Sequence, residues 1–177
     1  MTQIFNRFRK DRRGVAAVEF ALIAPVMVLL YCGLAELCQA VIAERKTNHV
    51  ASAVGDLITQ TDTVSTADLS DIFSIGNTVM APFPTSTLQM RVTSITADSN
   101  GVPKVDWSRT NGGMTAYSAG ATMTVPVTLN AGDSVVLSES SYQYTSVLHY
   151  VLPNTLTYNE HYYLRPRRSD KVTCTGC

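Results

Sequence analysis

This chain of 177 residues lacks the signatures of common enzyme families. A Gly-x-Ser-x-Gly elbow, a phosphate-binding loop and a dinucleotide-binding fingerprint are all missing. The three histidines, His49, His149 and His161, fall on different predicted elements, with no acid or cysteine at the spacing of metal ligands. We therefore expect no enzymatic activity, no metal and no cofactor.

An excess of charge of either sign is also missing. The 14 Lys and Arg residues balance 14 Asp and Glu residues, so the formal net charge is zero. A small basic tail near the C-terminus has no aromatic-basic module around it, so we interpret it as a solvated face and expect no binding to nucleic acid. The tail consists of Arg165, Arg167, Arg168 and Lys171.

Cysteine is scarce, with four residues in the chain. Cys32 and Cys38 lie six residues apart on a predicted helix, which puts them on different sides of it and prevents a bridge within one chain. Cys174 and Cys177 have the spacing of a redox pair, but a catalytic pair normally opens a helix, whereas this one stands at the end of the sequence. In an oxidising compartment we expect a small structural disulfide, or a link to a partner.

One long apolar run dominates the sequence, from Val15 to Ala35, and Glu19 is its one charged residue. As a helix the run rises about 30 Å, which matches the hydrocarbon core of a bilayer. Basic residues crowd its N-terminal side, and such residues stay cytoplasmic, so residues 1–13 are expected inside and those beyond the helix outside the cytoplasm. These basic residues are Arg7, Arg9, Lys10, Arg12 and Arg13.

Glu19 needs a physical reason, because a carboxylate in hydrocarbon costs on the order of 2.5 kcal/mol or more. An acid inside a membrane helix is therefore a functional-site hypothesis. The alternative is a side chain that snorkels to the headgroups, since Glu19 lies about one turn inside the cytoplasmic boundary.

A secretory signal peptide is a second interpretation of the same region, with Gly33 and Ala35 as the small residues before a cut. It predicts a soluble exported protein. The run is long for the apolar part of a signal peptide, Glu19 and Pro25 interrupt it, and the helical pattern continues past Ala35.

Behind an arginine pair, Gly14 is followed five residues later by Glu19, then by Phe20 and by Pro25. This order of residues resembles the TadE-like minor pilins, or pseudopilins, of the tight-adherence (Tad/Flp) type IVc pilus system of bacteria. A second, weaker likeness covers residues 132–144, which are similar to the strand that ends many family members.

The resemblance implies that prepilin peptidase cleaves between Gly14 and Val15, and that Glu19, Phe20 and Pro25 belong to an assembly motif. It implies a single-pass protein of the bacterial inner membrane, with a cytoplasmic N-terminus and a C-terminal head that is periplasmic or incorporated in the extracellular pilus. The partners would be the peptidase, other Tad pilins and pseudopilins, the inner-membrane assembly platform and the lipid bilayer. The role would be structural, in initiating, capping or joining the fibre.

Within a filament, Glu19 of one subunit can pair with the new ammonium group of Val15 of a neighbour. Breaking such a pair leaves a buried charge uncompensated, so the pair acts as a register device. Pro25 removes one backbone hydrogen bond and favours a kink in the helix. We interpret Glu36, one turn beyond the outer end of the run, as an interfacial residue without a special role.

Helical periodicity continues past the apolar run and predicts one long helix over residues 15–60, whose N-terminal half is transmembrane. Its apolar positions recur at spacings of three and four, at Val50, Ala51, Val54, Leu57 and Ile58. Residues 65–68 resemble a capping sequence and predict a short helix over Asp68–Met80, which Pro82 and Pro84 end.

After Thr85 the apolar residues alternate with a period of two, which predicts strands. Residues 98–101 indicate a hairpin turn, and residues 110–120 a loop. The strands are expected from Leu88 onward, at 123–129 as an edge strand or an extended loop around Pro126, at 135–147, and at 162–172 as a return strand. The fold class is thus α+β, with a leader at 1–14, the long helix, and a pilin-like head with an antiparallel sheet at 61–177.

Tyrosines gather in the last third of the chain, and they indicate either an interaction surface or ordinary sheet packing. Two alternatives to the minor pilin also stay open: an uncleaved single-pass assembly factor of the same apparatus, and a soluble exported binding domain.

Overall fold

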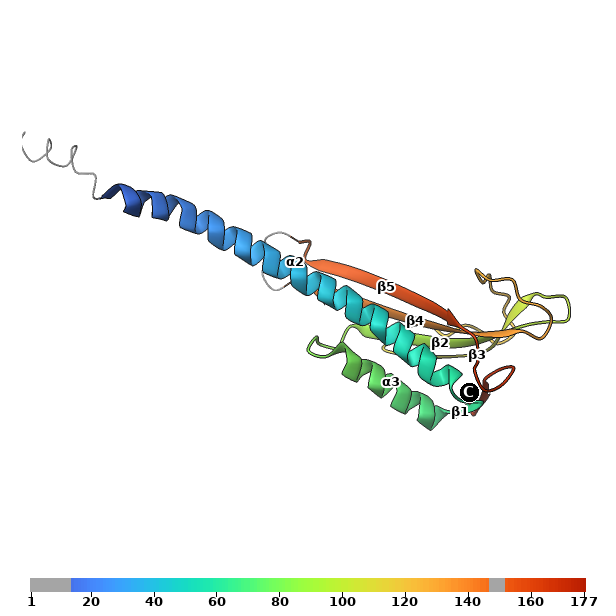
Figure 1. The fold of residues 1–177 in the computed structure, drawn as a ribbon. Coiled ribbons are helices and arrows are strands. Elements are labelled where there is room, and N and C mark those ends of the chain that lie inside the picture. The colour runs from blue at the N-terminus through green and yellow to red at the C-terminus, as the bar shows by residue number, and fades with distance from the viewer. Residues whose placement is uncertain (1–13, 147–151) are drawn as a thin grey trace, which may run out of the picture.

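The computed structural model describes residues 14–146 and 152–177. Its central element is one helix, α2 (Val15–Thr59), which projects from a head made of helix α3 (Thr66–Met80) and two small sheets (Figure 1). Residues 1–13 of the predicted leader at 1–14, His149 and the end of the predicted strand at 135–147 lie outside the described residues. The expected α+β fold, with a long N-terminal apolar helix and an antiparallel sheet, is confirmed.

The larger sheet has the strand order β3-β2-β4-β5, and every neighbouring pair in it is antiparallel. Its strands are β2 (Leu88–Ala97), β3 (Pro103–Asn111), β4 (Ser134–Thr145) and β5 (Thr155–Leu164). The C-terminal half of α2 lies on one face of this sheet, with α3 beside it (Figure 1). An antiparallel sheet can carry helices on one face, which is the arrangement seen here.

Local signals in the sequence located two elements correctly. Ser65 caps α3: its side chain accepts from the Asp68 backbone, and the Asp68 carboxylate accepts from the Ser65 backbone. The predicted turn at residues 98–101 joins β2 to β3, and Gly101 has a φ of 78°, which glycine adopts at low cost.

One strand prediction was left open and one was wrong. Residues 123–129 form no strand, so the extended loop is the correct one of the two alternatives, in line with the missing N–H of Pro126. The return strand beside β4 is Thr155–Leu164 and not residues 162–172, so the chain turns back earlier than the tyrosine-rich pattern indicated. The short parallel pair of β1 (Thr63–Ser65) and β6 (Thr173–Thr175) was not predicted, since three-residue strands carry no readable period.

A stripe of small residues fits α2 against the head. Buried positions recur along it at spacings of three and four, which is one face of a helix. We call these positions the packing stripe: Gly33, Glu36, Ala40, Ala43, Thr47, Val50, Ala51, Val54, Gly55, Ile58 and Thr59.

The packing stripe comes close to the sheet at Gly55. A Cβ atom there would lie 2.6 Å from Leu164 Cδ1 and 2.9 Å from Ser138 Cβ, both on the sheet. A Cβ at Gly76 of α3 would instead meet the sulfur of Met90 at 2.5 Å, which belongs to a flexible side chain. The helix therefore lies so close to the sheet at Gly55 that a side chain there would meet Ser138 of β4.

We predict that Gly55→Ala destabilises the head and that Gly76→Ala does so less. Overpacking costs about 1–3 kcal/mol, and alanine returns about 1 kcal/mol of helix propensity. At Gly55 the end of the Leu164 side chain can move, but Ser138 Cβ, at 2.9 Å, is fixed to strand β4, so we expect a net loss of up to about 2 kcal/mol. Denaturant unfolding of the two variants in detergent measures the difference, and equal stabilities would contradict the close contact.

Candidate functional site

The first part of α2 is uncovered by the rest of the described chain. Phe20 and Tyr31 are each 73% exposed and Leu22 is 70% exposed, and most other large apolar side chains before Gly33 are at least half exposed. Among the described residues, α2 is the single helix long and apolar enough to cross a membrane, and the most apolar part of it makes no buried contact. This exposed apolar surface needs lipid or other helices to cover it.

The helix begins at Val15, which is the residue after the predicted cut. Gly14 precedes it as the N-cap, with no side-chain cap and no acidic residue in the first turn. A Cβ atom at Gly14 would have no neighbour within 4 Å, so the described structure leaves open space around the predicted scissile bond.

The structure places the predicted assembly residues on the same exposed segment. Glu19 stands four residues after Val15, one turn along the helix, and both are exposed. Within the described part of the chain, Glu19 makes no ion pair. The helix runs through Pro25 without interruption, although the proline ring has no N–H for the usual bond to the carbonyl of Ala21.

Glu36 has a role that the sequence interpretation missed. It is 4% exposed and accepts a hydrogen bond from Ser146 Oγ, just after the end of β4. Burial, and to a smaller extent the nearby Glu36 carboxylate, raises the pKa of the Tyr144 hydroxyl. The expectation that Glu36 has no special role was therefore wrong, because its side chain is buried and bonded within the head.

The spacing of the packing stripe could have identified Glu36. It lies three residues after Gly33 and four before Ala40, both of which are buried. An acid at such a position must find a partner, and here it ties the last residues of β4 to the start of the packed half of α2.

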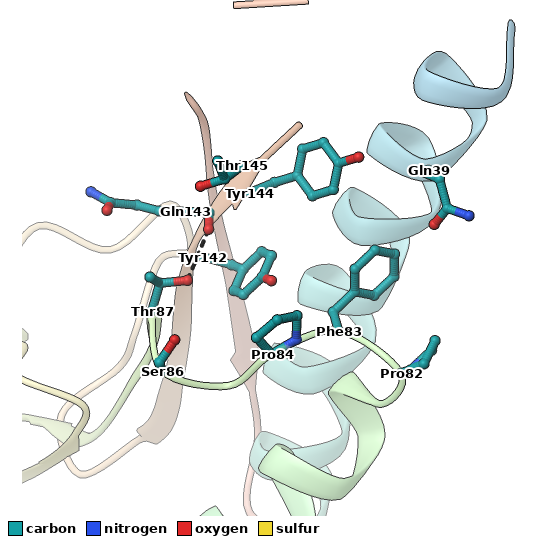
Figure 2. Close-up of a pocket in the computed structure, with 10 residues that line it drawn as sticks. All are labelled: Gln39, Pro82, Phe83, Pro84, Ser86, Thr87, Tyr142, Gln143, Tyr144 and Thr145. Carbon is teal, nitrogen blue, oxygen red and sulfur yellow. Dashed lines mark hydrogen bonds between the residues drawn. The ribbon is translucent and has the colours of Figure 1, made fainter. Parts of the chain in front are cut away.

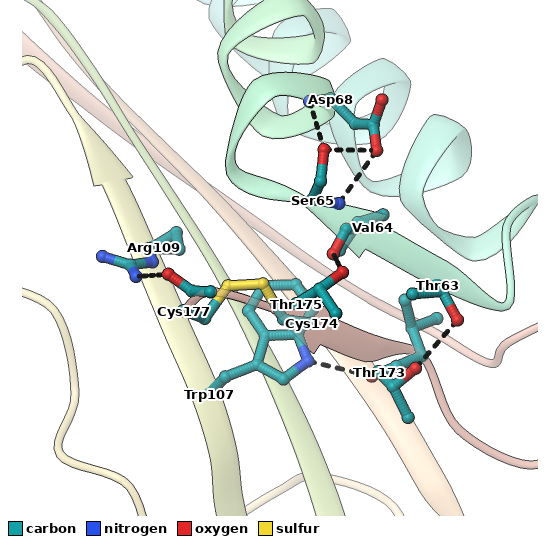
Figure 3. The surroundings of a disulfide bond; sticks show 12 residues. Thr63, Val64, Ser65, Asp68, Trp107, Arg109, Thr173, Cys174, Thr175 and Cys177 are labelled. Atoms are coloured by element: carbon teal, nitrogen blue, oxygen red, sulfur yellow. Dashed lines mark hydrogen bonds between the residues drawn. A yellow bond between two sulfur atoms is a disulfide. The ribbon is translucent and has the colours of Figure 1, made fainter.

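The far end of the head is closed by the C-terminal segment (Figure 3). Cys174 and Cys177 form a disulfide, and Cys32 and Cys38 are free. Trp107 Nε1 donates to the Val172 carbonyl at 2.9 Å, and Arg109 Nη2 donates to the Gly176 carbonyl at 2.9 Å. These contacts hold the C-terminal segment against β3, and the disulfide lies within that segment.

A charged cluster on the other face of the sheet was also missed. Arg91 on β2 donates to both oxygens of Glu139 on β4, at 2.6 and 2.7 Å, and lies 3.8 Å from the centre of the Tyr117 ring. The hydrogen bonds to Glu139 raise the pKa of the Arg91 guanidinium. Because Arg91 also bonds to the Thr115 carbonyl at 2.7 Å, the cluster fixes the loop after β3 over the sheet.

Comparison with known proteins gives one match. Residues 14–56 match the family described as TadE-like protein. The matched range begins at the predicted cut and covers nearly all of α2, whereas the sheet and α3 lie beyond it. No curated protein and no solved structure matched the chain.

We predict that Glu36→Ala destabilises the junction between α2 and β4. It leaves the Ser146 hydroxyl without its partner in a buried position, which costs about 1–3 kcal/mol. Hydrogen exchange of the amides at residues 143–146 should rise, and the free energy of unfolding should fall. Glu44→Ala, at an exposed site on the same helix, is the control and should change stability by less than about 0.5 kcal/mol. Equal effects of the two variants would contradict this role of Glu36.

Proposed function

We propose that this protein is a minor pilin or pseudopilin of the Tad (type IVc) pilus system, and that its role is structural. The observation that carries the proposal is the TadE-like match over residues 14–56, on a helix whose first half is apolar and exposed. The match indicates involvement in Tad pilus assembly, and pilus components of this kind build structures and do not catalyse reactions. Within that system we assign the protein to initiating, capping or joining the fibre.

Prepilin peptidase is the proposed processing enzyme, with its cut between Gly14 and Val15. Three features of the chain support this position: the side chain of residue 14 is absent, its surroundings are open, and the helix starts at residue 15. A glycine lets an extended backbone enter a protease groove at little steric cost. Cleavage there leaves α2 intact and removes only the basic leader.

Cleavage also creates a positive charge on the amino group of Val15, which the Glu19 carboxylate can compensate. The new ammonium group of Val15 adds a positive charge at the helix N-terminus, where the backbone dipoles already favour negative charge. No acidic residue stands in the first turn to compensate it. In a bundle of such helices, we propose that the Glu19 carboxylate of one subunit pairs with the Val15 ammonium group of a neighbour, which fixes their relative height.

The proposed location follows from the basic leader and the exposed segment. The protein would span the inner membrane once, with the leader in the cytoplasm and the head in the periplasm. Other Tad pilins or pseudopilins and the inner-membrane assembly platform would cover the exposed apolar surface of α2 once the protein leaves the lipid.

We predict that Glu19→Ala abolishes incorporation into pili and leaves cleavage intact. The variant removes the carboxylate, so the ammonium group of Val15 stays unpaired in an apolar bundle, which costs about 3–5 kcal/mol for a buried pair. Glu44→Ala, on the head-bound part of the same helix, is the matched control and should assemble normally. Immunoblots of sheared pili and of membranes measure assembly and cleavage separately. Normal pili from Glu19→Ala would contradict the pairing.

We predict that Gly14→Val prevents cleavage. Its branched side chain adds bulk beside the scissile bond, where glycine offers bare backbone to the peptidase groove. The uncut chain should run more slowly on a gel and be absent from pili. Cleavage of this variant at the normal rate would contradict the assignment of the site. Pili that contain an uncut chain would favour the membrane assembly factor that works without cleavage.

A further inference from the structure

The end of the head that faces the apolar part of α2 contains an aromatic cavity of about 450 Å³ (Figure 2). Phe83, on the loop after α3, forms edge contacts with Tyr142 and Tyr144 of β4, at ring-centre distances of 6.5 and 6.1 Å. The remaining walls come from the same loop, from β4 and from α2. They are Gln39, Pro82, Pro84, Ser86, Thr87, Gln143 and Thr145.

The cavity lies at a definite height along α2. If Val15–Ala35 fills the hydrocarbon core, Gln39 stands four residues further, about 6 Å beyond it. The headgroup layer of a bilayer extends about 5–7 Å beyond the hydrocarbon on each side. Tyr144 lies at about the same height, because Ser146, two residues further along the chain, is hydrogen-bonded to Glu36. The aromatic cavity and the headgroups are therefore at the same depth.

The side chains that line the cavity carry no formal charge. The ammonium group of Lys46 on α2 lies near them and donates to the Val79 carbonyl at 2.9 Å. Residues 72–90, 140–146 and 152–159 contain no Asp, Glu, Lys or Arg. At this height α2 has one acid, Glu36, and it is turned into the protein. The opposite end of the head instead carries ion pairs, such as Lys104–Asp98 at 2.9 Å and Arg167–Asp56 at 2.5 Å.

Aromatic and uncharged polar side chains are what a protein presents to the headgroup region of a membrane, where amphipathic rings are enriched. We propose that this end of the head lies in the headgroup layer of the membrane leaflet that faces the head, with the cavity open to phospholipid. We infer that the occupant is lipid because the span of α2 places the cavity at that depth, and because aromatic and uncharged polar side chains line it. This inference rests on the proposed membrane position of α2.

The contact would hold the head upright on the membrane before assembly. The packing stripe fixes α2 against the head. The unassembled protein therefore has two contacts with the bilayer: the apolar segment of α2 in the hydrocarbon and the cavity in the headgroup layer. Because no cationic side chain lines the cavity, the contact should not depend on anionic lipid, unlike contacts made by basic segments.

A tryptophan scan with brominated lipid tests the inference on the full chain. The native Trp107 is 7% exposed and bonded to Val172, so it serves as an internal reference. Phe83→Trp places the probe at the cavity, Leu22→Trp places it in the apolar segment of α2, and Val102→Trp places it at the β2–β3 turn, at the other end of the head. Each variant is reconstituted in phosphatidylcholine vesicles, with and without bromine on the acyl carbons nearest the glycerol.

We expect brominated lipid to remove the added emission of Phe83→Trp and Leu22→Trp, and to leave that of Val102→Trp unchanged. The loss should be equal in vesicles with and without phosphatidylglycerol. Quenching of Leu22→Trp without quenching of Phe83→Trp would overturn this inference and leave the membrane position of α2 intact. Quenching of neither would contradict the membrane position itself. Quenching of Phe83→Trp that requires phosphatidylglycerol would overturn the uncharged contact described here.

Discussion

The close approach of α2 to the sheet is the constraint on which the rest of the structure depends. One continuous helix must be apolar and exposed over its first half and pack on a sheet over its second half. The packing stripe lets the second half pack on the sheet, largely through small residues. At Gly55 the helix comes so near to β4 and β5 that a methyl group would meet Ser138 and Leu164. Because no break separates the two halves, the orientation of the head follows that of the apolar segment.

Local patterns in the sequence were sufficient for much of this architecture. The length of the helix, the cap at Ser65 and the turn at 98–101 follow from periodicity and turn chemistry, which act over a few residues. Long-range contacts were not readable. The pairing of β1 with β6, the Arg91–Glu139 bonds and the contact of Glu36 with Ser146 each join positions far apart in the chain. Pro126 was recognised as an obstacle to pairing, but the sequence alone did not decide between an edge strand and a loop.

The candidate site stays a prediction, and it depends on fewer contacts than the head because its residues lie within one short segment. Gly14, Val15, Glu19 and Pro25 fall on one exposed helix end, and the family match begins there too. Charge links these residues in the proposed function. The leader is basic, the first turn of α2 has no acid, and the Glu19 carboxylate lies one turn further along. In the proposed function, cleavage turns a membrane anchor into a subunit whose assembly depends on that carboxylate.

The central claim is that the functional chain begins at Val15. Mass spectrometry of the protein purified from its native host tests it most directly, because the mass and the N-terminal peptide identify the first residue. The account predicts a chain of residues 15–177 with a free amino group on Val15. An intact N-terminus at Met1 or Thr2 would contradict it and favour an uncleaved membrane factor, and a start near Glu36 would show that the apolar segment is a signal peptide.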